Sequence, residues 1–189
     1  MTIKKSILAV VLSVAATGAA VAGGHKALEY MAIKSSDVQL IDIIKTIGDN
    51  ETITDIELDD ENKQMVFEVK TIDLTADKEY ERVYSLEDGR VLEEESESLS
   101  FFGVNDLDER DEKAINAVKA SSVQLESLIP SLESKYQGKV LEVELEHKKG
   151  ISFYEVKMFT DKGMRQKILV NLDNGEEIPV MHHKGKHKH

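Results

Sequence analysis

The sequence contains no cysteine and no tryptophan, and only two of its 189 residues are prolines. Without cysteine, the chain has no disulfide, no thiol nucleophile, no thiolate metal site and no lipid anchor on a cysteine. Small secreted domains often depend on disulfides for their stability. This chain must instead depend on a buried core. Because aromatic residues make up only 5% of the sequence, that core consists mainly of Leu, Ile and Val.

Basic residues are also few, since 24 Lys and Arg stand against 36 Asp and Glu, for a formal net charge of -12. Nucleic acids and anionic membrane surfaces both prefer basic faces, so the charge argues against either as a partner. The sequence has no G-x-S-x-G, H-E-x-x-H, P-loop or G-x-G-x-x-G motif. We therefore expect no enzyme activity, no catalytic residue and no cofactor.

Two residue types that often carry catalysis are present, but in patterns that favour a structural interpretation. His147 stands beside lysines at the end of a predicted strand, as a solvated turn residue does, rather than as a general base. Glu142 and Glu144 fall on one face of the same predicted strand. General acid and base catalysis needs carboxylates in different environments across a cleft.

The N-terminus has the pattern of an export signal. Lys4 and Lys5 precede an apolar run over residues 7–14, and a small-residue stretch ends in an Ala-x-Ala triplet at Ala22. This pattern predicts a signal peptide over residues 1–22, cleaved before Gly23, and a periplasmic or secreted protein with no membrane contact after cleavage. The alternative is a retained anchor, because the uncharged stretch is just long enough to span a bilayer.

An internal repeat organises the rest of the chain. The segment TITDIELD, which begins at Thr52, aligns with KVLEVELE, which begins at Lys139, at an offset of 87 residues. At the same offset, the Glu-Val-Lys that begins at Glu68 falls on an identical Glu-Val-Lys that begins at Glu155. Self-similarity at a fixed spacing is typical of repeated structural units.

Further matches occur in the same order in both halves, including SSDVQL from Ser35 and SSVQL from Ser121. The matches predict two homologous units, the first over residues 23–105 and the second over residues 106–181. A His/Lys-rich tail over residues 182–189 follows them.

Hydrophobic periodicity assigns the same order of elements to both units. In the second, helices are expected over residues 111–120 and 125–136, and Pro130 should kink the latter helix or delay its start. Apolar residues then alternate with polar ones, which predicts strands at 140–146, 153–159, 166–172 and 176–181. The first unit has a helix over 40–47, ended by Gly48, and strands at 53–58, 65–72, 80–86 and 91–92.

Glycine-containing turns such as Asp161-Lys162-Gly163 favour antiparallel hairpins between these strands. The predicted fold is therefore of the α+β class. It consists of two tandem repeats, each with a helix or helix pair packed on an antiparallel sheet of three or four strands.

The segment from Gly138 to Ile178 resembles the PepSY domain. The resemblance is carried by Gly138-Lys139-Val140, Tyr154-Glu155-Val156 and the turn Asp173-Asn174-Gly175. The first unit matches less well, because its first strand begins at Glu51 without the glycine. The resemblance covers nearly all of the predicted mature chain in two copies. It implies exported modules that bind or restrain other proteins, often peptidases, and it supplies no catalytic residue.

The C-terminal tail is the main compositional oddity. His182, His183, His187 and His189 are candidate ligands for Zn, Ni or Cu, which neutral imidazole binds. The neighbouring lysines repel a cation, and a disordered basic tail or a pH-responsive patch are the alternatives.

The acidic run from Glu93 to Glu97 and the run over residues 106–112 are typical of solvated linkers. Phe101 and Phe102 lie between the two runs. They either dock between the units or offer a partner-binding spot.

Together these patterns favour a non-catalytic exported protein-binding module. Its expected partner is a protein, either a peptidase that it inhibits or an envelope sensor that it regulates. The alternative function is a metal-binding or metal-buffering envelope protein that uses the histidine tail.

Overall fold

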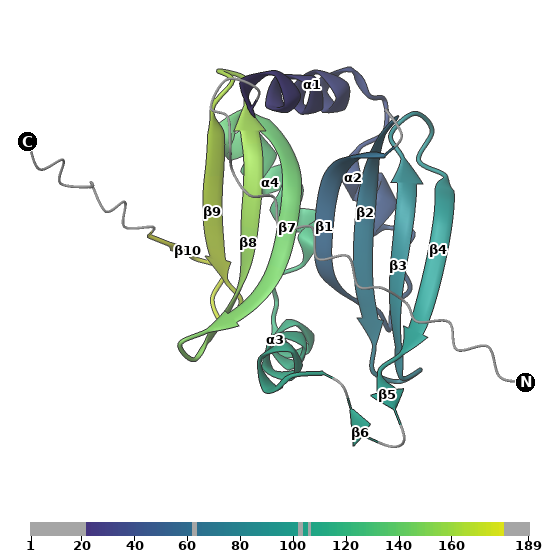
Figure 1. The fold of residues 1–189 in the computed structure, drawn as a ribbon. Helices are drawn as coiled ribbons and strands as arrows, with labels where there is room; N and C mark the ends of the chain where they lie inside the picture. Colours follow the sequence, from purple (N-terminus) through teal and green to yellow (C-terminus); the bar gives the residue numbers. More distant parts are fainter. Residues whose placement is uncertain (1–21, 62–63, 102–103, 106, 180–189) are drawn as a thin grey trace, which may run out of the picture.

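Eight strands form one antiparallel sheet in the computed structural model, which describes residues 22–61, 64–101, 104–105 and 107–179 (Figure 1). The strand order is β10-β9-β8-β7-β1-β2-β3-β4, so two meanders meet edge to edge. The first meander comprises β1 Thr52–Glu61, β2 Gln64–Asp73, β3 Lys78–Ser85 and β4 Val91–Ser98. The second comprises β7 Gly138–Lys148, β8 Ile151–Thr160, β9 Arg165–Asn171 and β10 Glu177–Ile178.

Two helices, α2 (Leu40–Ile44) and α4 (Leu125–Tyr136), contact each other and form a layer behind the sheet (Figure 1). Their apolar residues share one buried core with alternate residues of the strands. Because side chains of a strand alternate between faces, the same strands carry acids on the opposite side. The core residues include Ile43, Ile129, Ile56, Phe67, Val143 and Val156.

The predicted α+β class is therefore confirmed, with four helices and this eight-stranded sheet in the described residues. A second sheet has two short strands, β5 (Ser100–Phe101) and β6 (Val104–Asn105).

Several element boundaries differ from the prediction. The helix expected over residues 40–47 ends at Ile44, because hydrogen bonds three residues back tighten the chain at Thr46 and Ile47. The helix α4 begins at Leu125 and runs through Pro130, so the expected delay of its start was wrong. Packing of buried residues on both sides of the proline offsets the lost hydrogen bond.

The two meanders join through only three pairs of residues, at the middle of β1 and β7. Ile56 lies opposite Val143, which is 87 residues further along the chain, and both side chains are buried. Each of the two strands has a register shift at the same relative place, between Ile53 and Asp55 in β1 and between Val140 and Glu142 in β7.

Matching contacts also tie the helical segment of each half to its meander. Ser36 donates a hydrogen bond of 2.6 Å to the carbonyl of Leu86, and Ser121 donates one to the carbonyl of Leu172. These contacts are what a repeated unit would produce. The second copy and the boundaries at residues 23–105 and 106–181 nevertheless stay predictions.

The first helix of each half contacts the other half of the sheet. In α1 (Ala22–Ser35), Tyr30 lies 5.5 Å from the ring of Phe159, and Lys34 forms an ion pair of 3.1 Å with Asp161. In α3 (Glu109–Ala120), Ile115 packs with Ile72 of the first meander. Figure 1 shows these helices at opposite ends of the junction. The crossed contacts bind the two halves together.

No helix within the described ranges is long and apolar enough to cross a membrane. The predicted signal peptide falls on residues 1–22, of which only Ala22, the first residue of α1, is described. Its cleavage or retention stays a prediction.

Candidate functional site

A cavity of about 340 Å³ lies where α3 meets the ends of the first four strands. This size is at the lower end of the range for small-ligand pockets. Apolar, acidic and hydroxyl side chains from six elements and two connecting segments line it. They are Thr54, Ile72, Glu79, Glu97, Ser98, Leu99, Leu107, Asp111, Ala114, Ile115 and Leu145.

The floor of this acidic cavity is apolar. Ile72, Leu99 and Ile115 form a small buried cluster, with exposed fractions of 5% or less, and Leu107 and Leu145 pack against it. The cluster is separate from the main core. An apolar floor of this kind can accept the aliphatic part of a side chain from a ligand.

Three carboxylates from three different elements border the floor. Glu79 of β3 lies opposite Glu97 of β4, and Asp111 comes from the first turn of α3. Burial is the main cause that raises the pKa of Glu79; Lys70 opposes the shift, and the charges of Glu81, Glu97 and Asp111 add to it. Within the described part of the chain, none of the three bordering carboxylates forms an ion pair.

The helix α3 positions Asp111 because a strong capping residue precedes it. The side chain of Asp108 accepts hydrogen bonds from the backbone N–H groups of Arg110 and Asp111. Acidic residues in the first turn also favour the positive end of the helix dipole. The acidic run that we expected to be a linker over residues 106–112 therefore enters α3, which begins at Glu109. The linker prediction was wrong here.

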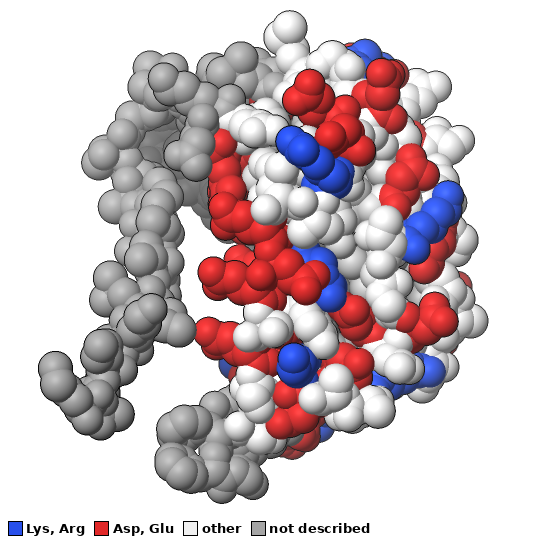
Figure 2. All heavy atoms as spheres, turned by 90° about the vertical axis from the view of Figure 1, so that its right-hand side faces the viewer, with Lys and Arg blue, Asp and Glu red and all other residues white. Residues whose placement is uncertain are grey.

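It was also wrong for residues 93–97, which belong to strand β4. This strand is exposed along its whole length and stands at one end of the sheet. Glu93 and Glu95 share a face with Glu97, because side chains of a strand alternate. Figure 2 shows acidic side chains gathered over this side of the molecule, with a few basic ones between them.

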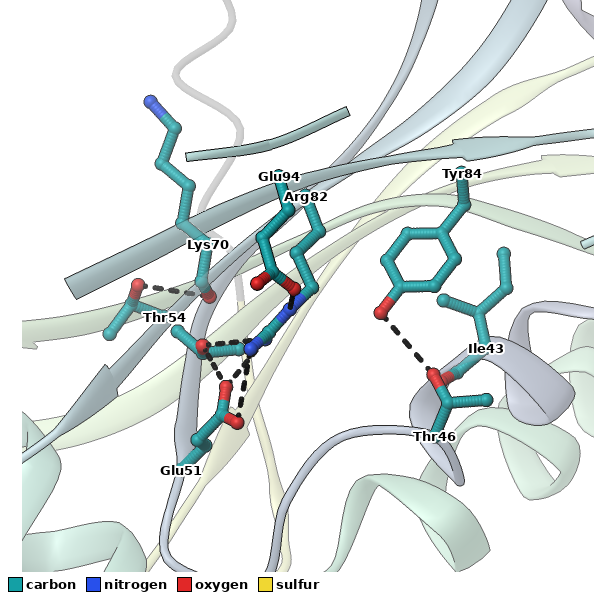
Figure 3. A network of polar contacts seen from close by, with 9 residues as sticks. Ile43, Thr46, Glu51, Thr54, Lys70, Arg82, Tyr84 and Glu94 are labelled. Carbon is teal, nitrogen blue, oxygen red and sulfur yellow. Dashed lines mark hydrogen bonds and ion pairs between the residues drawn. The ribbon is translucent and has the colours of Figure 1, made fainter. Parts of the chain in front are cut away.

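The opposite face of β4 is held by a polar network around Arg82. Its guanidinium donates to Glu51 at 2.6 Å and to Glu94 at 2.7 Å, and Thr71 also donates to Glu51 (Figure 3). The side chains of Arg82 and Glu51 are only 11% and 13% exposed. Burial raises the pKa of Glu51, but Arg82 and Thr71 outweigh it and hold that pKa below its usual value. The network fixes β4 against β3, so it supports the cavity rather than belonging to it.

A second group of carboxylates lies at the junction of the two meanders. Asp55 is opposite Glu144, and Glu57 is opposite Glu142. Burial, followed by the charges of Glu57 and Glu144, raises the pKa of Asp55 to about 6. Like charges directly opposite each other destabilise a sheet. Lys157 forms an ion pair with Glu142, its charge also opposes the rise in the pKa of Glu57 and Glu144, and Lys70 opposes the rise in that of Asp55.

The structure brings His147 close to Ser152, with 2.8 Å between Nδ1 and Oγ. The two residues are cross-strand partners in β7 and β8, and Ser152 is only 6% exposed. His147 is therefore a strand residue rather than the turn residue that we expected. A buried hydroxyl in a sheet cannot reach a substrate, so the pair has a structural role.

The predicted metal ligands His182, His183, His187 and His189 lie outside the described residues, as do Phe102 and the side chain of Phe101. Elsewhere, in the part that the structure describes, no group of three or more His, Asp or Glu could hold a metal ion. Metal binding by the tail stays a prediction.

Sequence reasoning missed the three carboxylates of the acidic cavity. Glu97 belongs to a run in which every second residue from Glu93 is a glutamate, and this period of two follows the predicted strand at Val91. That signal could have extended the strand. Nothing in the sequence could have placed Asp111 beside Glu79, because that contact depends on α3 crossing to the first meander.

The second meander and its helices match a known family. Residues 111–179 match the model of the family described as "Peptidase propeptide and YPEB domain", PepSY. The match confirms the resemblance for most of the predicted second unit. PepSY domains are generally non-catalytic domains of the propeptide or inhibitor type. The match therefore indicates an exported module.

One solved structure is similar over much of the chain. It is described as a "putative lipoprotein" from Clostridium difficile 630, with 20% sequence identity and a TM-score of 0.44. The similarity covers 81% of this chain and 98% of the other. A search of curated proteins gave no match.

Proposed function

We propose that this chain is an exported, non-catalytic protein-binding module whose partner is a peptidase that it inhibits or an envelope sensor that it regulates. The observation that carries the proposal is the acidic cavity beside the exposed edge of β4. The family match over residues 111–179 supports the class of partner.

The chemistry of the cavity suits a protein partner better than a small polar substrate. Its floor is apolar, and its carboxylates come from three elements. The two hydroxyls in its lining are engaged in hydrogen bonds, Thr54 to the carbonyl of Lys70 and Ser98 to Asp77. It also continues into the glutamate-bearing face of β4, so a ligand can extend beyond it. Recognition of an extended, complementary surface is what such an arrangement can provide.

The test begins with the exported form of the protein, purified from the envelope of cells that express the full chain. This protein is used to capture binding proteins from an envelope extract, with and without a chelator. Each protein retained is then purified and tested for direct binding. A peptidase among them is assayed for inhibition, with a variant lacking residues 182–189 as the control for the tail.

The expected result is a partner that binds directly and is retained in the presence of chelator and without the tail. A partner that is lost with either change would contradict the proposal and favour the metal-binding alternative. Hydrolysis by the purified protein that a single substitution abolishes would contradict the non-catalytic part.

A further inference from the structure

We infer that the partner presents an extended segment with basic side chains at alternate positions, which adds to the sheet beside β4 and places one Lys or Arg side chain in the acidic cavity. This inference rests on the proposed function. It names the chemistry and the conformation of the partner segment.

The free edge of the sheet is the first observation. β4 pairs with β3 on one side, and no strand among the described residues pairs with its other side. Unpaired N–H and C=O groups along an edge strand can accept a further strand. The strand also begins with two large apolar side chains that are exposed, Val91 at 45% and Leu92 at 37%.

The spacing of the glutamates is the second observation. Glu93, Glu95 and Glu97 stand on one face of β4, two residues apart. An added strand would repeat at the same interval, so basic residues at alternate positions would face all three. On the other face, Glu94 is already paired with Arg82, so it contributes little to a new partner.

The acidic cavity is the third observation, and it selects the anchoring residue. Its apolar floor suits the aliphatic stem of Lys or Arg, and the bordering carboxylates suit the cationic end. Glu97 lies both on the glutamate face of β4 and at the border of the cavity. A segment on β4 therefore reaches the cavity without leaving the edge.

Charge complementarity excludes the opposite kind of segment. Nearby Lys70 forms an ion pair of 3.7 Å with Glu81, which leaves the three bordering carboxylates to repel an acidic ligand. A second copy of the same edge could also pair with β4, but it would bring glutamates against glutamates. Like charges in this arrangement suppress pairing.

The test uses synthetic peptides and the exported protein, with binding measured by fluorescence anisotropy. A peptide of alternating Thr and Arg should bind, whereas one of alternating Thr and Glu should not. A peptide of the same composition as the first, with its arginines contiguous, should bind at least about threefold more weakly. Equal binding of the two arginine peptides would show general charge attraction and overturn the inference.

Matched variants locate the site. Glu97→Gln with Asp111→Asn should weaken binding of the alternating peptide about tenfold, since both changes remove charge that faces its cation. The control is Glu126→Gln with Asp173→Asn, which removes the same charge from exposed residues of α4 and the β9–β10 turn. An equal loss in both variants would overturn the inference. Circular dichroism confirms that each variant is folded.

Backbone methylation tests the strand addition. Methylation of alternate backbone nitrogens along one edge of the peptide should abolish binding, and the same change along the other edge should preserve it. Equal effects from the two edges would exclude addition to β4. If a natural partner still binds the Glu97→Gln, Asp111→Asn variant with unchanged affinity, the proposed function stands and this inference fails.

Discussion

The two halves of the sheet have different side chains at positions 87 residues apart in the sequence. In the first half, Arg82 lies opposite Val69 on β2 and forms a largely buried polar network with Glu51 and Thr71. In the second half, the residue opposite Val156, 87 positions after Val69, is the buried Ile168.

The other two positions differ in the same way. Gly138 stands 87 residues after Glu51, and the buried Met158 stands 87 residues after Thr71. The first half thus places polar and charged side chains where the second half has the buried Ile168 and Met158 and a glycine. That network holds Glu94 and so fixes the acidic edge strand β4. Beside the edge strand β4, the first half therefore has a buried polar network in place of apolar packing.

Removing the centre of the network should have the largest effect. Arg82→Ile introduces into the first half the residue type that Ile168 provides in the second. It also leaves the carboxylate of Glu51 buried without its cation. Breaking a pair that is largely buried costs about 3 kcal/mol of unfolding free energy. Urea unfolding followed by circular dichroism measures the loss.

The control combines Arg82→Ile with Glu51→Gln, which removes the orphaned charge and should recover at least about 1 kcal/mol. If the single variant loses less than about 0.5 kcal/mol of unfolding free energy, the ionic network does not stabilise the fold. The two halves would then differ here in residue type but not in stability.

Adding a side chain at the corresponding position of the second half should have the next largest effect. A Cβ at Gly138 would lie 2.1 Å from the carbonyl oxygen of Phe159, so Gly138→Ala must move backbone. We expect a loss of about 2 kcal/mol in urea unfolding. An unchanged stability for Gly138→Ala would contradict this close approach.

The sequence predicted the features that depend on local pattern. Alternation of apolar residues gave the strands from Ile53 and Val140. Helical spacing of apolar residues gave the helix that begins at Leu125, because each of these signals lies within one element. The helix that begins at Leu40 was predicted too long. Its apolar residues continue into a tight turn, and the apolar pattern alone cannot distinguish that turn from a helix.

The candidate site was not predicted, because it depends on contacts between distant elements. A run of glutamates is typical of a linker until a partner strand is known. Here Arg82 binds Glu94, and the ladder with β3 makes the run a strand. Likewise, the crossing of α3 to Ile72 brings Asp111 to the first meander, and no spacing in the sequence records that crossing.

The matching serine contacts should give smaller, equal effects. Ser36→Ala and Ser121→Ala each remove a hydrogen bond to a turn carbonyl, at Leu86 and at Leu172. Each should lower the unfolding free energy by about 1 kcal/mol. Ser127→Ala, whose exposed hydroxyl donates to the carbonyl of Gln124 at the start of α4, is the control and should change little. Losses that differ by more than about 1 kcal/mol would count against a repeated unit.

The smallest effects should come from the carboxylates at the junction, and they should have opposite signs. The raised pKa of Asp55, about 6, lies above the unfolded value, so the folded state binds the proton more tightly. The stability that Asp55 contributes is therefore present at low pH and is lost as the pH rises through about 6. Asp55→Asn should stabilise the protein at pH 7 by about 0.5 to 1 kcal/mol, after allowance for solvent screening.

Glu142 stands 87 residues after Asp55 and pairs with Lys157, so Glu142→Gln should instead destabilise by about 0.5 kcal/mol. Unfolding in urea at pH 5 and pH 7 measures both variants. At pH 5, where most Asp55 is already protonated, the gain from Asp55→Asn should shrink toward zero. If Asp55→Asn and Glu142→Gln change the unfolding free energy in the same direction at pH 7, the two halves do not differ in their charge interactions at the junction. The two halves would then differ in their cores but not at their joint.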